Sequence, residues 1–90
     1  MTWKIELSTL ARKNLGDLDK QIAKRILRFL HDRIAKLKNP RDIGDALKGV
    51  KLGVFWKYRV GDYRIIADIQ DRELIILVIR IGNRREVYKR

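Results

Sequence analysis

The stretch from residue 55 to residue 88 is the part of this sequence that most restricts the fold. It reads FWKYRVGDYRIIADIQDRELIILVIRIGNRREVY, and apolar and polar residues alternate on both sides of Gly61-Asp62. A Gly-Asp pair between two alternating segments is a typical signal of a two-residue β-hairpin turn. The predicted register pairs Arg59 with Arg64, and it also pairs Val60 with Tyr63, Tyr58 with Ile65 and Lys57 with Ile66.

This register sorts the side chains of the hairpin onto two faces. One face is apolar and suited to lie under helices; it holds Trp56, Tyr58, Val60, Tyr63, Ile65 and Ala67. The other face brings three cations together; it holds Phe55, Lys57, Arg59, Arg64, Ile66 and Asp68. A register error of one residue would exchange the two sets.

The cationic face predicts an anion site. Like charges placed directly opposite each other destabilise a strand pair by up to about 1 kcal/mol, so selection for stability alone disfavours Arg59 opposite Arg64. Arg side chains match the geometry of phosphate oxygens, which favours a phosphate ligand. The alternative is a solvated face on which Asp68 or water relieves the repulsion.

A second hairpin is predicted with its turn at Asp71-Arg72, followed by a strand over residues 74–81 that is apolar on both faces. Such a strand is usually central and covered on both sides. We expect helices on one face, and on the other Ile75, Leu77, Ile79 and Ile81, near Arg64. An apolar surface beside exposed cations indicates a partner protein that covers it part of the time.

The first forty residues predict one strand and two helices. Residues 3–7 alternate between apolar and polar, and Ser8 can cap a short helix that Gly16 ends. Asp17 or Asp19 can cap a longer helix with apolar residues at i, i+3 and i+4, namely Ile22, Ala23, Ile26, Leu27, Leu30, Ile34 and Leu37. The predicted fold is therefore α+β: an N-terminal strand and an αα-hairpin packed on one face of a mainly antiparallel, twisted sheet of about four to five strands.

The connection between the helices and the basic hairpin is rich in glycine. Asn39-Pro40 ends the second helix, and residues 41–53 (RDIGDALKGVKLG) form a loop in which a phosphate can reach Lys48 and Lys51. No internal repeat or linker divides the sequence, so residues 1–90 are predicted to form a single domain.

Composition excludes several classes of function. The absence of cysteine excludes disulfides and thiolate metal sites, and a single His with scattered carboxylates does not indicate any other metal site or a cofactor. The net charge of +11 favours a polyanionic partner, such as nucleic acid, a ribosome or an acidic protein. The longest apolar run, residues 74–79, is too short to cross a bilayer, and we expect a cytoplasmic protein that does not bind membranes.

Three segments carry a resemblance to a known family: LARKNLGDLDKQIAKRI, LKGVKLGVFWKYRVGDYRIIADI and VIRIGNRREVY. Over residues 3–88 the chain resembles the RelE/ParE superfamily of bacterial type II toxins, and specifically its RelE-like branch. The resemblance implies an αα-hairpin on an antiparallel sheet, and a toxin that cleaves mRNA in the ribosomal A site. It also implies a cognate antitoxin that holds the toxin inactive, and operator DNA as a partner only through the antitoxin complex.

The resemblance also implies the site residues. Lys57 and Arg64 match cations of the family's active face, Arg84 the arginine after the last long strand, and Tyr88 the C-terminal aromatic. We therefore expect catalysis from Lys57, Arg64, Arg84 and Tyr88, and RNA or phosphate binding from Lys48, Lys51, Arg59 and Arg85. Many relatives have His where this chain has Asn83, and Asn cannot exchange a proton at neutral pH.

Without a metal, RNA is cleaved when the 2′-OH attacks its own phosphorus, and clustered cations stabilise the phosphorane that forms. The candidates for taking the 2′-OH proton are Lys57 and, as a phenolate, Tyr88. In the favoured scheme Lys57 is the base or proton shuttle, Arg64 and Arg84 clamp the phosphate, and Tyr88 stacks on a base or donates a proton. Two alternatives remain open: a ParE-like inhibitor of DNA gyrase that performs no chemistry, and a toxin fold that has lost its activity.

Overall fold

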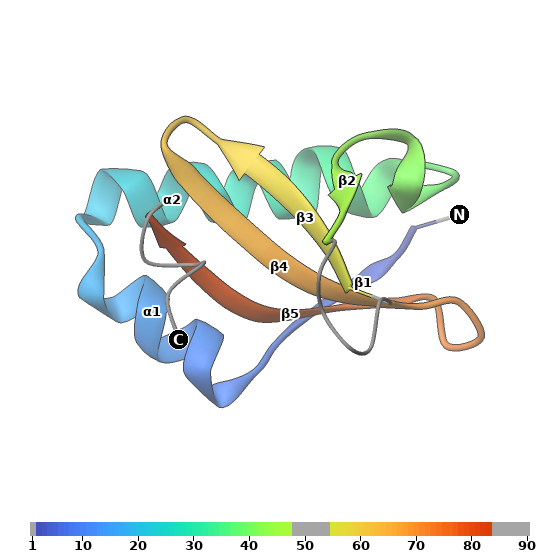
Figure 1. The fold of residues 1–90 in the computed structure, drawn as a ribbon, viewed down its shortest axis with the longest axis horizontal. Helices are drawn as coiled ribbons and strands as arrows, with labels where there is room; N and C mark the ends of the chain where they lie inside the picture. Colours follow the sequence, from blue (N-terminus) through green and yellow to red (C-terminus); the bar gives the residue numbers. More distant parts are fainter. Residues whose placement is uncertain (1, 48–54, 84–90) are drawn as a thin grey trace.

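A computed structural model describes residues 2–47 and 55–83, which form a helical layer on one face of a five-stranded sheet (Figure 1). In chain order the helices and strands are β1 (Lys4–Leu7), α1 (Thr9–Asp17), α2 (Lys20–Arg28), β2 (Asp45–Ala46), β3 (Phe55–Val60), β4 (Tyr63–Gln70) and β5 (Ile75–Asn83). The strand order is β1-β5-β4-β3-β2; β1 is parallel to β5, and all other neighbours are antiparallel. The predicted α+β fold is confirmed.

Both helices begin at the capping residues expected from the sequence. The Ser8 hydroxyl accepts a hydrogen bond from the Ala11 N–H at 3.0 Å, and the Asp19 carboxylate accepts one from the Gln21 N–H at 3.2 Å. Helix α1 continues through Gly16 to Asp17 and ends where Leu18 adopts an extended conformation. The predicted end at Gly16 was therefore slightly too early.

The second helical segment is less regular than the sequence pattern predicts. After α2 the chain continues as a π-helical segment (Phe29–Arg33) and a 3₁₀ turn (Ile34–Lys36). The wider π turn alters the 3.6-residue period, so that Ala35 is buried beside Ile34. The carbonyl of Ala35 also accepts a hydrogen bond from the Trp3 N–H at 2.7 Å, which joins this segment to the start of β1.

The described part of the predicted 41–53 loop contains short regular structure. A 3₁₀ turn (Pro40–Asp42) is capped by the Asn39 side chain, and β2 then pairs with β3. A strand of two residues has too few positions to show an alternating pattern, which is why the sequence did not indicate it. Lys48 and Lys51 lie outside the described residues.

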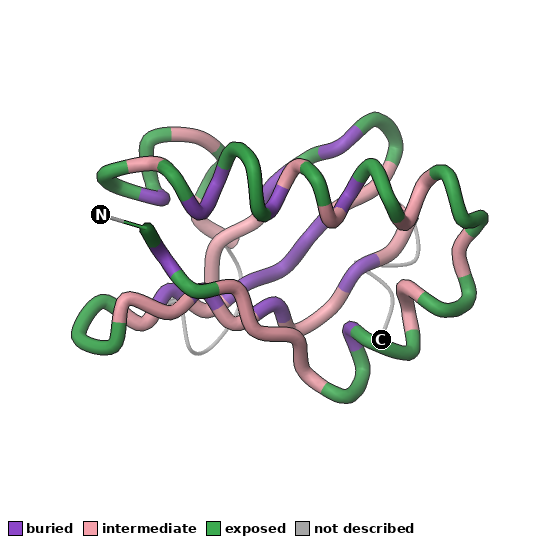
Figure 2. Tube along the Cα trace, turned by 180° about the vertical axis from the view of Figure 1, so that it is seen from behind, coloured by how far each residue is buried: buried purple, intermediate pink, exposed green. Residues whose placement is uncertain are grey.

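The register predicted for the β3–β4 hairpin is confirmed throughout. Arg59 is opposite Arg64 and Lys57 is opposite Ile66, and the turn glycine, Gly61, has a φ of 60°. Of the predicted helix-facing residues, four are in the buried core, while Trp56 and Tyr63 are partly buried and pack against it. The core consists of Trp3, Ala11, Ile26, Leu30, Ile34, Tyr58, Val60, Ile65, Ala67, Ile69, Ile76, Val78 and Ile81. Figure 2 shows buried segments along the sheet, while exposed segments lie on the outer side of the helices.

The prediction for β5 is wrong at its C-terminal end. Val78 is opposite Ala67, but the next pair is Arg80 with Ile66, so Ile79 is an extra residue that forms a β-bulge. After this bulge Ile81 faces the core with 2% exposure, whereas strict alternation placed it on the open face. Of the predicted apolar residues of the open face, Ile75 and Leu77 keep their place opposite Gln70 and Asp68.

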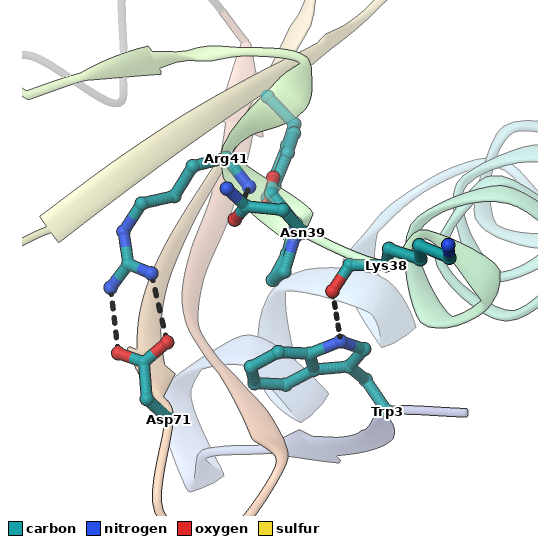
Figure 3. A network of polar contacts seen from close by, with 7 residues as sticks. Trp3, Lys38, Asn39, Arg41 and Asp71 are labelled. Atoms are coloured by element: carbon teal, nitrogen blue, oxygen red, sulfur yellow. Dashed lines mark hydrogen bonds and ion pairs between the residues drawn. The ribbon is translucent and has the colours of Figure 1, made fainter. Parts of the chain in front are cut away.

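Two polar contacts fasten the turns at one end of the sheet (Figure 3). The indole N–H of Trp3 donates to the Lys38 carbonyl at 3.4 Å. Arg41 forms a two-pronged ion pair with Asp71 at 2.9 and 3.0 Å, which joins the 3₁₀ turn to the β4–β5 turn. Hydrogen bonding to this guanidinium lowers the pKa of the Asp71 carboxyl below its usual value. No helix in residues 2–47 and 55–83 has the length and apolar character needed to cross a bilayer.

Candidate nucleic-acid interface

A cleft of about 530 Å³ contains the three cations that the sequence placed on one face. Lys57 and Arg59 come from β3, and Arg64 comes from β4. Arg33, from the π-helical segment, adds a fourth cation from the helical layer. The other lining residues are Phe29, Ile43, Gly44, Asp45 and Tyr58. The lining therefore has four cations and one carboxylate, which makes it positively charged.

The cleft lies where β3 becomes the edge of the sheet. Strand β2 pairs with Trp56 and Lys57, and the Leu47 N–H donates to the Phe55 carbonyl at 3.0 Å, so this pairing does not reach Arg59. The chain next to β2 passes very close to β3 at Gly44, whose φ is 82°. A Cβ there would lie 2.4 Å from the Lys57 carbonyl oxygen, so only glycine allows this approach.

Two aromatic side chains of β3 hold this wall of the cleft in place. The Trp56 indole N–H donates to the Ile43 carbonyl at 2.7 Å, and the buried Tyr58 hydroxyl donates to the Pro40 carbonyl. Burial raises the pKa of the Tyr58 phenol well above its usual value. The phenol is therefore neutral, and its role is the hydrogen bond that holds β3 against the Pro40 turn. Phe29 packs edge-on against Tyr58, with ring centroids 6.2 Å apart.

The two arginines at the centre of the cleft face each other across β3 and β4. Neither forms an ion pair within the described residues, and Arg64 makes only a long contact, 3.5 Å, from its guanidinium to the Tyr63 carbonyl. On the β5 side, Arg64 is opposite Gly82, which has no side chain. Both guanidinium groups are therefore available to an anion.

A second hollow of about 460 Å³ extends the basic surface towards α2. It shares Phe29, Arg33 and Arg59 with the first cleft and adds Arg25 and Arg28 from the exposed side of α2. Asp32 is the only carboxylate among its lining residues. Arg25 and Arg28 thus continue the cationic surface of β3 onto α2.

Sequence reasoning missed two cations near this site. Arg33 enters the cleft from the π-helical segment, whose geometry no residue pattern indicated. Arg80 reaches the open face because of the bulge at Ile79, and its only sequence signal was a lone cation within an apolar strand. The predicted site residues Arg84, Arg85 and Tyr88 lie outside the described residues, as do Lys48 and Lys51.

The charges that line the cleft suit an anionic ligand such as phosphate. No group of three or more His, Asp or Glu side chains within residues 2–47 and 55–83 is arranged to hold a metal ion. Four cations around one cleft can neutralise a phosphate and stabilise further negative charge that develops on it. The same cations also suit the carboxylates of an acidic protein segment.

Several proteins with a similar sequence or fold are described as toxins. Toxin RelG of Mycobacterium tuberculosis is 26% identical over 90 residues, which cover all of both chains. The toxin–antitoxin complex RelBE2 from the same species contains a chain with a TM-score of 0.82 and 22% identity, with 92% of each chain covered. The archaeal RelE–RelB complex of Pyrococcus horikoshii contains one with a TM-score of 0.72 and 25% identity, covering 93% of this chain and 97% of the other.

The isolated RelE toxin of E. coli has the same fold, with a TM-score of 0.68 and 16% identity over 90% of this chain and 83% of that one. A family described as the ParE toxin of the type II toxin–antitoxin system parDE matches residues 5–88, which is nearly the whole sequence. The chain therefore belongs to this family of type II toxins and has the fold of the RelE-like toxins.

Proposed function

We propose that this toxin is a ribosome-dependent endoribonuclease that cleaves mRNA in the ribosomal A site and so inhibits translation. The 2′-OH of the substrate attacks the neighbouring phosphorus, which leaves a 2′,3′-cyclic phosphate and a free 5′-OH. The reaction needs neither a metal ion nor a cofactor, because positive charge on the protein stabilises the phosphorane. The ribosome supplies the orientation of the substrate that a shallow cationic cleft does not.

The observation that carries this proposal is the cluster of Lys57, Arg59 and Arg64 in one open cleft. Two directly opposed arginines are a cost to the fold, and an anionic ligand removes that cost. Inhibition of gyrase without chemistry does not require such a cluster of cations. Binding of an RNA phosphate explains it, because each Arg can donate two parallel hydrogen bonds to phosphate oxygens.

The proposed roles follow from position in the cleft. Lys57 acts as the base or proton shuttle, Arg64 clamps the scissile phosphate, and Arg59 binds the neighbouring backbone. Arg84 is proposed as a second clamp and Tyr88 as a stacking residue or proton donor, on the resemblance of the sequence alone. Lys48 and Lys51 are proposed to bind RNA because the sequence places them in the loop before the basic hairpin, and Arg85 is proposed as a further cation next to Arg84.

A cognate antitoxin is the proposed protein partner. Several solved structures with this fold are complexes of a RelE toxin with a RelB antitoxin, including the archaeal complex from Pyrococcus horikoshii. An acidic antitoxin segment is expected to neutralise the basic cleft, and operator DNA is contacted only through the antitoxin in the complex. The toxin acts where it meets translating ribosomes, in the cytoplasm.

The test is to induce the toxin in cells and to map mRNA 5′ ends on ribosomes. We expect in-frame cuts at A-site codons with the wild-type chain, and a loss of about 100-fold or more with Arg64→Ala, by analogy with the deletion of one oxyanion donor. Arg72→Ala is the matched control, because Arg72 is an exposed cation in the distant β4–β5 turn. If induction of the toxin arrests growth while the mRNA remains intact, the proposal is refuted.

The second candidate is a ParE-like inhibitor of DNA gyrase, which the description of the matched family favours. It predicts gyrase-dependent DNA breaks and altered supercoiling after induction, with mRNA unchanged. Measuring both mRNA ends and plasmid supercoiling in the same culture separates the two functions. A chain that produces neither effect but still binds an antitoxin would be a toxin fold without activity.

A further inference from the structure

The β-bulge in β5 decides where Arg80 lies. Ile76 and Val78 are fully buried on the core face, so an unbroken alternation would send the Arg80 guanidinium into the core as well. Burying an unpaired charge costs several kcal/mol. The extra residue, Ile79, turns Arg80 to the open face and returns Ile81 to the core.

On the open face Arg80 lies on the same side of the sheet as Lys57 and Arg64. Its direct neighbour on β4 is Ile66, and the neighbour of Ile66 on β3 is Lys57, so the three form one cross-strand row. Arg64 is the diagonal neighbour of Arg80, at a typical spacing of about 7–8 Å. On β5 the residue opposite Arg64 is Gly82, two positions after Arg80.

The N-cap residue of α1 and a residue within the helix fix the backbone on both sides of Arg80. The Ser8 hydroxyl donates to the Ile79 carbonyl at 2.8 Å, and the Ile81 N–H donates to the Asn14 side-chain oxygen at 3.0 Å. Strand β1 ends its pairing with β5 at Val78, so these two side chains replace the missing strand partner. The bulge is thus held by specific contacts and is not a loose strand end.

Two explanations of this arrangement can be compared. If the bulge only kept a cation out of the core, an apolar residue at position 80 would achieve the same fold without a bulge. The chain instead places a guanidinium on the face of the sheet that already contains Lys57 and Arg64. Bulges are over-represented beside active sites, where they redirect a side chain.

We propose that Arg80 is a phosphate-binding residue of the RNA site and contacts a backbone phosphate next to the one that Arg64 holds. Ser8 and Asn14 are its positioning residues, because they fix the strand from which it projects. The ligand named here rests on the proposed function. The binding role of Arg80 can nevertheless be tested separately from cleavage.

The experiment measures binding of a 2′-O-methylated RNA oligonucleotide, which lacks the attacking hydroxyl and is not cleaved, at several salt concentrations. Each phosphate contact to single-stranded RNA contributes about 0.7 to the slope of log affinity against log salt. Arg80→Gln should reduce the slope by about 0.7, Arg80→Lys should retain it, and Arg72→Gln, in the exposed β4–β5 turn, should match the wild type. A structural role alone would not change this slope.

A second measurement uses the wild-type chain, so it does not depend on a folded variant. An arginine-specific dicarbonyl reagent is applied with and without the oligonucleotide, and modified residues are identified by mass spectrometry. Bound RNA should protect Arg80 and leave Arg72 reactive. Unchanged labelling of Arg80, or an Arg80→Gln slope equal to that of the wild type, would overturn the inference.

Assays of cleavage on programmed ribosomes distinguish failure of the two proposals. Cleavage by the wild type together with an unaltered Arg80→Gln slope would reject Arg80 and keep the nuclease. If the wild type does not cleave mRNA but Arg80→Gln still lowers the salt slope of RNA binding, the nuclease proposal is rejected and the anion-binding role of Arg80 is kept. If both hold, Arg80→Gln should also slow cleavage by about 10-fold or more, as the loss of a charged hydrogen-bond donor does.

Discussion

The opposed pair Arg59 and Arg64 should make the fold less stable than it would be without one of the two charges. Guanidinium groups about 6 Å apart in water repel each other by roughly 0.7 kcal/mol, and 0.1 M salt reduces this to about 0.4 kcal/mol. Arg64 is half-buried in the cleft, which weakens the screening, so about 0.4–1 kcal/mol is expected. Arg59→Gln should therefore stabilise the protein by this amount.

The measurement is thermal or urea unfolding of Arg59→Gln beside Arg59→Lys. The Lys variant keeps the charge and a long side chain, so the difference between the two variants isolates the repulsion. For a domain of this size the gain corresponds to a rise in Tm of roughly 2–8 °C. The gain should nearly disappear at 1 M salt, where the Debye length falls to about 3 Å.

A double-mutant cycle sharpens the test. Arg59→Gln and Arg64→Gln relieve the same repulsion, so the double variant should gain little more than either single variant. The stabilised variants should also bind RNA less tightly, because the removed charge serves the ligand. Equal stability of the Gln and Lys variants at low salt, or a gain that salt does not reduce, would refute the reasoning.

Three further substitutions test the architecture around the cleft, each by equilibrium unfolding. Gly44→Ala should destabilise the fold by about 2 kcal/mol or more and weaken RNA binding, because its positive φ disfavours a side chain and its Cβ would meet backbone at 2.4 Å; unchanged stability would contradict the close approach. Tyr58→Phe should cost about 1–3 kcal/mol, because it leaves the Pro40 carbonyl without its donor, and a neutral result would argue against that hydrogen bond. Asp71→Asn should cost a few tenths of a kcal/mol at pH 7, since the pair with Arg41 is largely exposed to screening solvent. Because the pKa of Asp71 is lowered in the fold, that difference should persist above about pH 4 and vanish as the pH falls through the folded-state pKa; a difference that grows in acid would reverse the assigned sign.

Local sequence signals predicted most of the fold and one part of the site. The capping residues Ser8 and Asp19 and the Gly61-Asp62 turn act over a few residues, so they can be recognised without knowing the rest of the chain. The turn fixed the register, and the register alone placed Lys57 on the same face as Arg64. The alternation of side chains was therefore sufficient to predict that Lys57 and Arg64 share a face.

The features that sequence reasoning missed depend on tertiary contacts. The bulge at Ile79 is held by the Ser8 hydroxyl from another element, so nothing near Arg80 in the sequence indicates it. Arg33 enters the cleft because the helix widens into a π turn, which no residue type specifies. Both corrections add cations to the predicted site, and both arise where regular periodicity fails.

The parallel pairing of β1 with β5 has a consequence for how the toxin folds during its synthesis. Ser8 and Ile79, which contact each other at this junction, are 71 residues apart in sequence. During synthesis the helices emerge before the central strands that cover their apolar faces, so the sheet closes only after β5 has been made. The row of Lys57, Ile66 and Arg80 forms at that late step. A nascent chain therefore has no complete basic face while the ribosome is still extending it.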